Sequence, residues 1–275
     1  MSASDAAPRK LRLAFIGWGA IAIRVAELLA ERRPAGVEIA AVAVRDPAKP
    51  RPGLPETVRL LHAPEDLAGL GIDMIIEVAG RQAAAEWGEA ALRHAGRFVP
   101  CSTSAFCDDA LLARMVETAG RLGGRVLVPS GALGDIGALA AAARLPLSEV
   151  THTVVKPPQA WKGTPAAETL DLDGLTERTA FFSGSAREAA SRFPNNANVA
   201  AISALAGIGL DRTRIVLVAD PATTRNVHEI SASGAFGKLD MRLENEALAN
   251  NPKSSEMTAL SLVRLIENAV SPLVI

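Results

Sequence analysis

The stretch FIGWGAIAIRVAELLAERR, residues 15–33, joins an apolar run to a helical pattern through two glycines. Glycine is unfavourable inside strands and helices, so Gly17 and Gly19 mark a place where the backbone turns sharply or is approached closely. Together with Ala22 at the third small position, they match the dinucleotide-binding fingerprint. This motif lies between a strand-like run and the first long helix, and in that context it indicates dinucleotide binding.

Ala20 and Ile21 follow the second glycine and stand in the first turn of the expected helix. Backbone N–H groups in that turn have no helical partner, and the helix dipole favours an anion beside them. We therefore expect Gly17, Gly19, Ala20 and Ile21 to bind the pyrophosphate of a dinucleotide.

Short apolar runs alternate with helical patterns from residue 11 to about residue 128. The runs are nearly continuous in apolar character, as in strands buried on both faces of a parallel sheet: LRLAFIG, VEIAAVAV, DMIIEVAG, GRFVPCS and GRVLVPS. Helical patterns lie between them over 20–33, 83–94 and 107–120, with a short one beginning at residue 64. This alternation predicts a doubly wound, Rossmann-type α/β domain with a parallel sheet.

The pattern changes after residue 133. An alanine-rich helix over about 136–143 precedes runs with the period of two that is typical of antiparallel strands: VTHTVVK, ETLDLD, ERTAFFSG, RIVLVAD, TTRNVHEISAS and GKLDMRLE. One helix over 199–207 interrupts these runs, and a helix over about 254–266 closes the chain. We expect an α+β domain with an open, mainly antiparallel sheet.

The expected domain boundaries follow from this change of pattern. Residues 1–132 and 244–275 form the dinucleotide-binding domain, to which the C-terminal helix returns, and residues 133–243 form the substrate, catalytic and dimerisation domain. An open sheet leaves one face without a partner, so we expect a homodimer through that sheet.

Composition narrows the class of protein. Of 275 residues, 49% are hydrophobic and 21% charged, which is ordinary for a folded protein, and the net charge of −1 favours neither nucleic acid nor a membrane surface as partner. No uncharged stretch approaches the roughly 20 residues that span a bilayer. The polar first ten residues carry no export signal, and Cys101 and Cys107 form neither a zinc motif nor a disulfide framework. We expect a cytoplasmic protein with a small-molecule substrate and no metal.

The end of the second expected strand selects the cofactor. An Asp or Glu there usually binds the ribose hydroxyls of NAD, and a nearby arginine accommodates the 2′-phosphate of NADP. This chain has Arg45 followed by Asp46, so NAD and NADP both remain open as cofactor.

Beyond the fingerprint, the chain resembles the L-aspartate dehydrogenase family over nearly its whole length after residue 10. The resemblance is carried, in order and spacing, by EVAG, VPSGAL, VTHTVVKPP, FPNNANVAA, RNVHEISASGAFG and NPKSSEMTALS. It implies interconversion of L-aspartate and NAD(P)⁺ with iminosuccinate and NAD(P)H, the imine being hydrolysed to oxaloacetate and ammonia or passed on toward nicotinamide cofactor synthesis. It also implies NAD contacts at Ala132 and Asn198 and a catalytic histidine at His228. The turn at 131–139 departs from the family pattern, because its acid and glycine are exchanged at Asp135 and Gly137.

A proton-transfer group is also expected from the chemistry, because oxidation of an amine requires protons to move on nitrogen and on water. The chain holds four histidines: His62, His94, His152 and His228. Strand alternation places Thr224, Asn226 and His228 on one face, an unusual polar stripe unless it lines a site. The residues alone leave open whether His228 transfers protons or is a surface histidine.

The carboxylates of aspartate need cations or aligned donors. Lys156 ends a strand and shares a face with His152, so it is a candidate for contact with a carboxylate or the imine, although a strand-end lysine in solvent would look the same. Asn195, Asn196 and Asn198 precede a helix that they can cap while donating to substrate or nicotinamide. We assign Asn195, Asn196 and Asn226 to the substrate.

Two other functions stay open at this stage. Dihydrodipicolinate reductase and homoserine dehydrogenase combine a similar first domain with an open sheet, but neither accounts as well for FPNNANVAA followed by RNVHEI. A non-catalytic dinucleotide sensor would bind the cofactor without a proton-transfer group.

Overall fold

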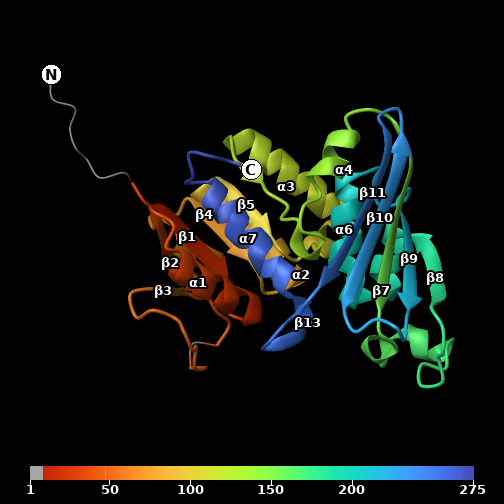
Figure 1. The fold of residues 1–275 in the computed structure, drawn as a ribbon. Helices are drawn as coiled ribbons and strands as arrows, with labels where there is room; N and C mark the ends of the chain where they lie inside the picture. The colour runs from red at the N-terminus through yellow and green to blue at the C-terminus, as the bar shows by residue number, and fades with distance from the viewer. Residues whose placement is uncertain (1–8, 47) are drawn as a thin grey trace. The chain divides into compact units, whose positions relative to one another are not determined.

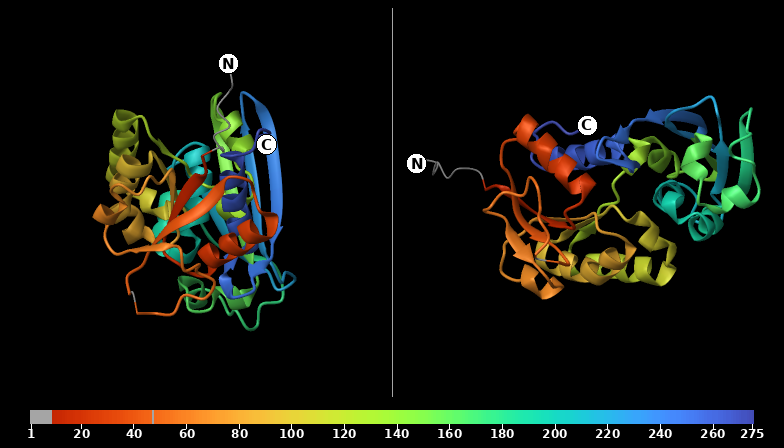
Figure 2. Two further views of the ribbon diagram at one scale, coloured as in Figure 1. Left: turned by 90° about the vertical axis from the view of Figure 1, so that its left-hand side faces the viewer. Right: turned by 90° about the horizontal axis from the view of Figure 1, so that it is seen from below.

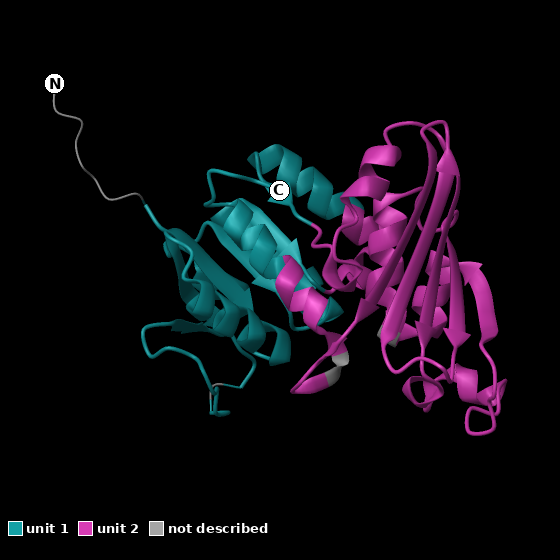
Figure 3. Ribbon diagram, in the orientation of Figure 1, with its two compact units in different colours: residues 1–101, 113–127, 262–275 teal, residues 102–112, 128–261 magenta. Residues whose placement is uncertain are grey.

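The computed structural model describes residues 9–46 and 48–275, apart from the side chains of residues 195, 252 and 253. The described chain divides into two compact units, coloured separately in Figure 3. Unit 1 holds the described residues up to Cys101 together with 113–127 and 262–275, and unit 2 holds 102–112 and 128–261. The boundaries differ from those expected, because these segments cluster with unit 2 rather than with the dinucleotide-binding domain: 102–112, 128–132 and 244–261.

Unit 1 is built on a six-stranded sheet in which every strand pair is parallel. Its strands, labelled in part in Figure 1, are β1 (Leu11–Ile16), β2 (Val37–Ala43), β3 (Arg59–Leu61), β4 (Met74–Glu77), β5 (Arg97–Pro100) and β6 (Arg125–Val126). The order β3-β2-β1-β4-β5-β6 is the doubly wound order of dinucleotide-binding folds. The expected α/β fold class is confirmed, and only the short edge strand β3 was not anticipated.

Helices cover both faces of this sheet. They are α1 (Ala20–Arg32), α2 (Arg81–Ala95), α3 (Asp109–Leu122) and α7 (Glu256–Asn268), with the short 3-10 helix η1 (Pro64–Leu67). Figure 2 shows α1 and the unit 1 part of α7 on one face and α2 with the unit 1 part of α3 on the other. Arg32 binds Glu267 at 2.5 Å, which ties α1 to α7. The part of α7 from Leu262 onward therefore packs in unit 1, whereas its first turns belong to unit 2.

Unit 2 is built on a five-stranded mixed sheet of order β11-β10-β7-β9-β8. Its strands are β7 (Leu147–Lys156), β8 (Thr179–Ser185), β9 (Arg214–Ala219), β10 (Asn226–Gly234) and β11 (Gly237–Asn245), and a separate pair is formed by β12 (Ala247–Leu248) and β13 (Asn251–Ser255). All neighbours in the five-stranded sheet are antiparallel except β7 and β9. The expectation of a mainly antiparallel sheet is therefore confirmed.

The helices of unit 2 lie on one face of that sheet, where α4 and α6 are visible in Figure 1. They are α4 (Gly137–Ala142), α5 (Ala186–Arg192) and α6 (Ala197–Ala206), with the 3-10 helices η2 (Thr103–Cys107), η3 (Gly131–Leu133), η4 (Pro158–Trp161), η5 (Pro165–Glu168) and η6 (Pro194–Asn196). We call the covered side the inner face and the opposite side the outer face. Strand alternation turns Val150, His152 and Val154 of β7 to the inner face, where all three are buried.

Two expectations for unit 2 were wrong. The run ETLDLD, residues 168–173, forms no strand, because η5 and a series of bends occupy it. The helix α5 was missed, although Ser185 and Glu188 form a capping box at its start: Ser185 Oγ accepts from the backbone N–H of Glu188, and Glu188 accepts from that of Ser185. That signal was readable in the sequence.

Candidate functional site

The two fingerprint glycines have different environments in unit 1. Gly17 has a φ of +95°, and a Cβ atom built on it would lie 2.9 Å from the Cβ of Ala79, so the turn itself requires glycine there. A Cβ atom on Gly19 would meet nothing within 4 Å. Open space at Gly19 is what the approach of a bulky anion to the backbone requires.

The N-terminus of α1 is prepared for an anion. Its cap residue is Gly19, no side chain caps the first turn, and no acidic residue stands in it, so the N–H groups of Ala20 and Ile21 are not neutralised from within the helix. Ala22 is fully buried and lets the helix approach the sheet. These features fit the pyrophosphate of a dinucleotide.

A neighbouring strand end carries a buried carboxylate that sequence reasoning missed. Glu77 closes β4 with no exposed surface, and its Oε1 accepts hydrogen bonds from the backbone N–H groups of Ala79 and Gly80, both at 2.7 Å. It thereby holds the turn that packs against Gly17 and begins α2. Burial and then the charge of Glu77 raise the pKa of the Cys101 thiol, which keeps that cysteine protonated and unreactive.

Arg45 and Asp46 follow β2, as expected, and both are exposed. Asp46 Oδ1 accepts from the backbone N–H of Ala48 at 2.9 Å. Arg45 has no ion-pair partner in the described part of the chain, so its guanidinium is available for a phosphate.

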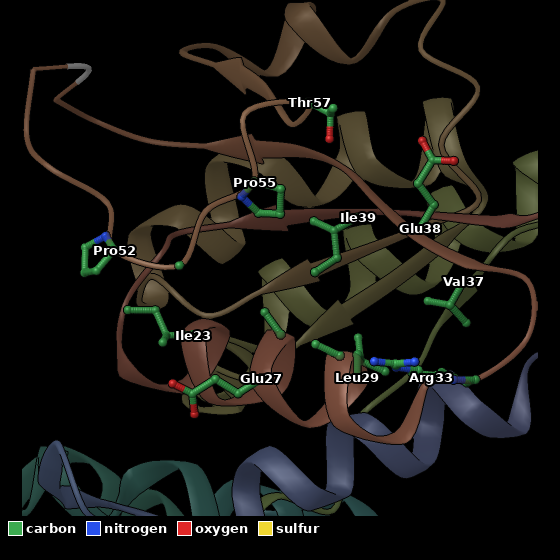
Figure 4. A pocket seen from close by; sticks show the side chains of 14 residues that line it. Ile23, Glu27, Leu29, Arg33, Val37, Glu38, Ile39, Pro52, Pro55 and Thr57 are labelled. Atoms are coloured by element: carbon green, nitrogen blue, oxygen red, sulfur yellow. The ribbon is translucent and has the colours of Figure 1, made fainter.

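Unit 1 also has a groove of about 700 Å³ between α1, β2 and the loop at 52–57, shown in Figure 4. Residues from α1, β2 and the loop at 52–57 line it, among them Ile23, Glu27, Ile39 and Pro55. None of the predicted cofactor residues is among its lining, which begins at Ile23, directly after the fingerprint.

In unit 2, the structure brings His228 and His152 together on the inner face of the sheet. Ile230 of β10 pairs with His152 of β7, and Val154 pairs with His228, so the two imidazoles occupy diagonal positions on adjacent strands. His152 Nε2 lies 3.1 Å from His228 Nδ1, and His152 Nδ1 lies 3.1 Å from the hydroxyl of Ser203 on α6. His228 is therefore a buried residue, 3% exposed, and its surface interpretation is wrong.

The polar stripe around His228 is shorter than expected. β10 begins at Asn226, and Thr224 lies in an exposed bend before it, so Thr224 does not share the strand face. Asn226 does, because it is two residues from His228 within the strand.

Both imidazoles are neutral in this environment. Burial lowers the pKa of His152 to about 3. Burial, and then the charges of His152 and Lys156, hold the pKa of His228 well below its usual range. A neutral His228 has one unprotonated ring nitrogen that can accept a proton.

Lys156 lies on the same inner face at the end of β7. Its neighbour Val155 pairs with Val227 near the start of β10, and Lys156 Nζ lies 5.3 Å from the centre of the Trp161 ring. Burial lowers its pKa to about 8, and no carboxylate among the described residues pairs with it. A partly buried ammonium without a carboxylate partner is suited to an anionic ligand, and its solvent-exposed interpretation is wrong.

The asparagines at the start of α6 differ in how far they are exposed. Asn196 is 6% exposed, whereas Asn198 is exposed and its Oδ1 accepts from the backbone N–H of Ser104 in η2 at 3.0 Å. The side chain of Asn195 lies outside the described part of the structure. Asn196 stands at the N-cap of α6, but its side chain makes no cap hydrogen bond there.

The turn at Ala132 is held by two residues that sequence reasoning missed. Asn245 of β11 donates from Nδ2 to the carbonyl of Ala132 at 2.7 Å, and Ser261 of α7 accepts from the N–H of Gly131 at 3.1 Å. Asp135 accepts from the backbone N–H of Gly137 at 2.7 Å, which gives the exchanged acid a turn-forming contact.

The candidate residues thus divide between the units. Unit 1 holds Gly17, Gly19, Ala20, Ile21 and Arg45, and unit 2 holds the rest: Ala132, Lys156, Asn195, Asn196, Asn198, Asn226 and His228. Within the described ranges, no three His, Cys, Asp or Glu side chains gather in a metal-binding arrangement. Nor does any helix described here have the length and apolar character needed to cross a membrane.

Comparison with known proteins agrees with this geometry. Residues 137–269 match the family model described as aspartate dehydrogenase, C-terminal, and residues 17–129 match the one described as homoserine dehydrogenase, NAD binding domain. An L-aspartate dehydrogenase of Brucella anthropi is 53% identical over 263 residues, covering 96% of this chain and 98% of that protein.

Solved structures give the same picture. The aspartate dehydrogenase of Thermotoga maritima superposes with a TM-score of 0.76 at 27% identity, covering 97% of this chain and 100% of that one. A dihydrodipicolinate reductase from Paenisporosarcina superposes with a TM-score of 0.55 at 14% identity over 95% of each chain, a likeness of fold alone. The chain belongs to the L-aspartate dehydrogenase family.

Proposed function

We propose that this chain catalyses the reversible oxidative deamination of L-aspartate to iminosuccinate with NAD⁺ or NADP⁺, followed by hydrolysis of the imine to oxaloacetate and ammonia. One observation in unit 2 carries the proposal beyond family membership. A neutral histidine and a lysine without a carboxylate partner lie on the same inner face of one sheet, and this pair fits proton transfer beside a dicarboxylate.

The residues of unit 1 fit a dinucleotide. The open space at Gly19 and the uncapped N-terminus of α1 suit a pyrophosphate, and Arg45 suits a 2′-phosphate. Gly17, Gly19, Ala20, Ile21 and Arg45 would hold the cofactor, with Ala132 and Asn198 added by the family resemblance. When bound, the nicotinamide accepts the two electrons and the hydrogen that leave Cα of the substrate.

His228 is proposed to move the protons. The substrate ammonium must lose a proton before Cα can be oxidised, and water must lose one as it attacks the imine carbon. A neutral imidazole accepts the first proton and releases it to solvent, then accepts the second from water and returns it to nitrogen as ammonia leaves. The carboxylates of a bound dicarboxylate would raise the pKa of His228 toward neutrality, because negative charge favours the protonated ring.

Lys156 is proposed to bind a substrate carboxylate, which would supply the anion that its ammonium lacks among the described residues. Asn195, Asn196 and Asn226 are proposed to donate hydrogen bonds to the substrate, and Asn226 pairs across the sheet with Asn245 at the same edge.

We further propose a homodimer through the outer face of the unit 2 sheet. No described helix of unit 2 covers that face, and it carries a hollow of about 360 Å³ lined by short or charged residues such as Thr151, Thr153, Glu229 and Arg242. Sedimentation of the wild type and of Thr153→Arg tests this: a dimer that dissociates in the variant supports the interface. We also propose a cytoplasmic location, which fits two cysteines that form no disulfide with each other.

The activity is tested by mixing the protein with L-aspartate and NAD⁺ or NADP⁺ at alkaline pH and following absorbance of the reduced nicotinamide. L-homoserine and D-aspartate serve as matched substrate controls. Turnover of L-aspartate alone supports the proposal, whereas turnover of homoserine contradicts the substrate. Tight cofactor binding with no turnover of L-aspartate indicates a dinucleotide sensor instead.

A further inference from the structure

His228 does not stand alone on the inner face of unit 2. Its Nδ1 is bonded to His152, His152 is bonded to Ser203, and Ser203 Oγ lies 3.2 Å from the carbonyl of Val199 and 3.1 Å from that of Ala200. This chain of contacts runs from β10 through β7 to α6, and all of it lies inside one compact unit.

The direction of the chain follows from counting protons. A serine hydroxyl has one proton, and a carbonyl oxygen can only accept one. If Ser203 donated its proton to His152, its oxygen would face two carbonyl oxygens at 3.1–3.2 Å with no hydrogen between them. If Ser203 instead directs its proton toward α6, the two carbonyls share that proton, and each contact between the side chains has one donor and one acceptor.

The second arrangement assigns the proton on each ring. Ser203 Oγ then accepts from Nδ1–H of His152, which leaves His152 Nε2 as an acceptor. His152 Nε2 accepts from Nδ1–H of His228, which leaves His228 Nε2 with a lone pair. None of the described residues hydrogen-bonds to that nitrogen, so it is free to act on a ligand.

We propose that Ser203 and His152 are positioning residues that hold His228 in the tautomer whose Nε2 is unprotonated. The proposal rests on the proposed role of His228 in proton transfer and assigns the atom that performs it. His152 does not itself shuttle protons, because the chain ends at helix carbonyls that cannot pass a proton on.

A neutral partner has a chemical consequence. A carboxylate at the position of His152 would stabilise the imidazolium form, whereas an imidazole orients His228 without adding charge. Titratable groups that face His228 are His152 and Lys156, both on β7. On its other sides, β11 presents Leu243 and Asn245, and α6 contains no charged residue. The orientation is therefore independent of pH over the neutral range.

The tautomer can be read directly without cofactor or substrate. Long-range ¹H–¹⁵N correlation spectra of the ¹⁵N-labelled full chain distinguish protonated from bare ring nitrogens, and His62→Gln and His94→Gln assign the other two histidines. We expect Nδ1–H on both His152 and His228 and a bare Nε2 on His228. A proton on His228 Nε2 as the main form overturns the proposal.

Kinetic variants test the consequence. Ser203→Ala removes the acceptor for His152 and lets both rings reverse, so kcat should fall by roughly 10–100-fold, the range typical of groups that orient a functional histidine. KM for aspartate and cofactor Kd should change little. The loss should be the same across the pH profile, because the two neutral tautomers do not interconvert with pH. Ser191→Ala, an exposed serine of α5, is the matched control.

His152→Gln supplies the rescue. Its amide oxygen can accept from His228 and its amide nitrogen can donate to Ser203, so it should retain more turnover than His152→Leu, with the Nδ1–H form of His228 intact in the spectra. Equal losses in the two variants with the tautomer unchanged contradict the positioning role.

The two proposals fail differently. If His228→Asn keeps wild-type turnover, proton transfer by His228 is wrong, and the positioning proposal falls with it. If His228→Asn loses turnover while Ser203→Ala keeps wild-type kcat and tautomer, only the positioning proposal is wrong.

Discussion

The two units prepare for their ligands with different parts of the chain. Unit 1 offers backbone: the N–H groups at the start of α1 and the bare Cα of Gly19. Unit 2 offers side chains on a strand face, where His228 and Lys156 reach position only because β7 and β10 pair in one register. A backbone site leaves a mark of glycines in the sequence, whereas a side-chain site depends on which strands are neighbours.

A substitution at the backbone site of unit 1 should have the strongest effect. Gly19→Val should abolish dinucleotide binding without unfolding the chain, because its side chain fills space that only a ligand would occupy. Gly17→Ala is the matched contrast: its Cβ would meet Ala79 at a φ of +95°, which should lower the free energy of unfolding by about 1–3 kcal/mol. Calorimetric titration measures cofactor binding by both variants, and thermal melts measure their stability. Unimpaired cofactor binding by Gly19→Val contradicts the assignment of Gly19 to the pyrophosphate site.

The next effect concerns the side-chain half. His228→Asn keeps size and a hydrogen bond but cannot transfer protons near neutral pH, so kcat should fall by roughly 10²–10⁴-fold. Cofactor Kd should stay nearly constant, because the fingerprint lies in unit 1. Steady-state kinetics measure kcat, and cofactor titration measures Kd. A large change in cofactor Kd with unaltered kcat would mean that His228 serves cofactor binding rather than proton transfer.

Lys156→Met should weaken aspartate binding without destabilising the fold. KM for aspartate should rise by roughly tenfold, the value of one charge-assisted contact. In the wild type, KM should rise as pH passes about 8, because the lysine loses its charge there.

The same variant should be more stable than the wild type at neutral pH, although it binds aspartate less well. The folded pKa of about 8 lies below the ordinary 10.5, so the folded state binds the Lys156 proton less tightly than the unfolded state. Charged Lys156 therefore disfavours folding below pH 8, and this cost disappears as pH rises toward 10.5. Lys156→Met should melt higher than the wild type at pH 7 and converge with it near pH 10; a lower melting temperature at pH 7 counts against a buried, unpaired ammonium.

The smallest effect sharpens the cofactor choice. Arg45→Ala should weaken NADP(H) binding by about fivefold and NAD(H) binding less, because an exposed guanidinium contributes only modestly to ion pairing. Titration with both cofactors tests this, with Lys49→Ala on the same loop as control. Equal weakening of NADP(H) and NAD(H) binding would contradict the proposed contact between Arg45 and the 2′-phosphate.

Local patterns were sufficient for most of unit 1 and for parts of unit 2. Continuous apolar runs marked β1, β2, β4, β5 and β6, since strands buried on both faces need apolar residues throughout. The edge strand β3 has three residues and leaves too short a pattern to detect. ETLDLD shows the opposite failure: its alternation fits a strand, but no neighbouring strand pairs with it, and pairing is a tertiary property.

The fingerprint turn, the parallel sheet and the family could all be predicted from the sequence, because each depends on residues that are close along the chain or matched in order. The surroundings of His228, in contrast, depend on how distant segments pack. His152 stands 76 positions away and contacts His228 because β7 pairs with β10, and Ser203 of α6, 51 positions from His152, contacts the other nitrogen of that ring. Asn245 meets the Ala132 carbonyl across 113 positions in the same way. Hydrogen bonds between distant segments depend on strand order and register, which no local pattern of side chains specifies.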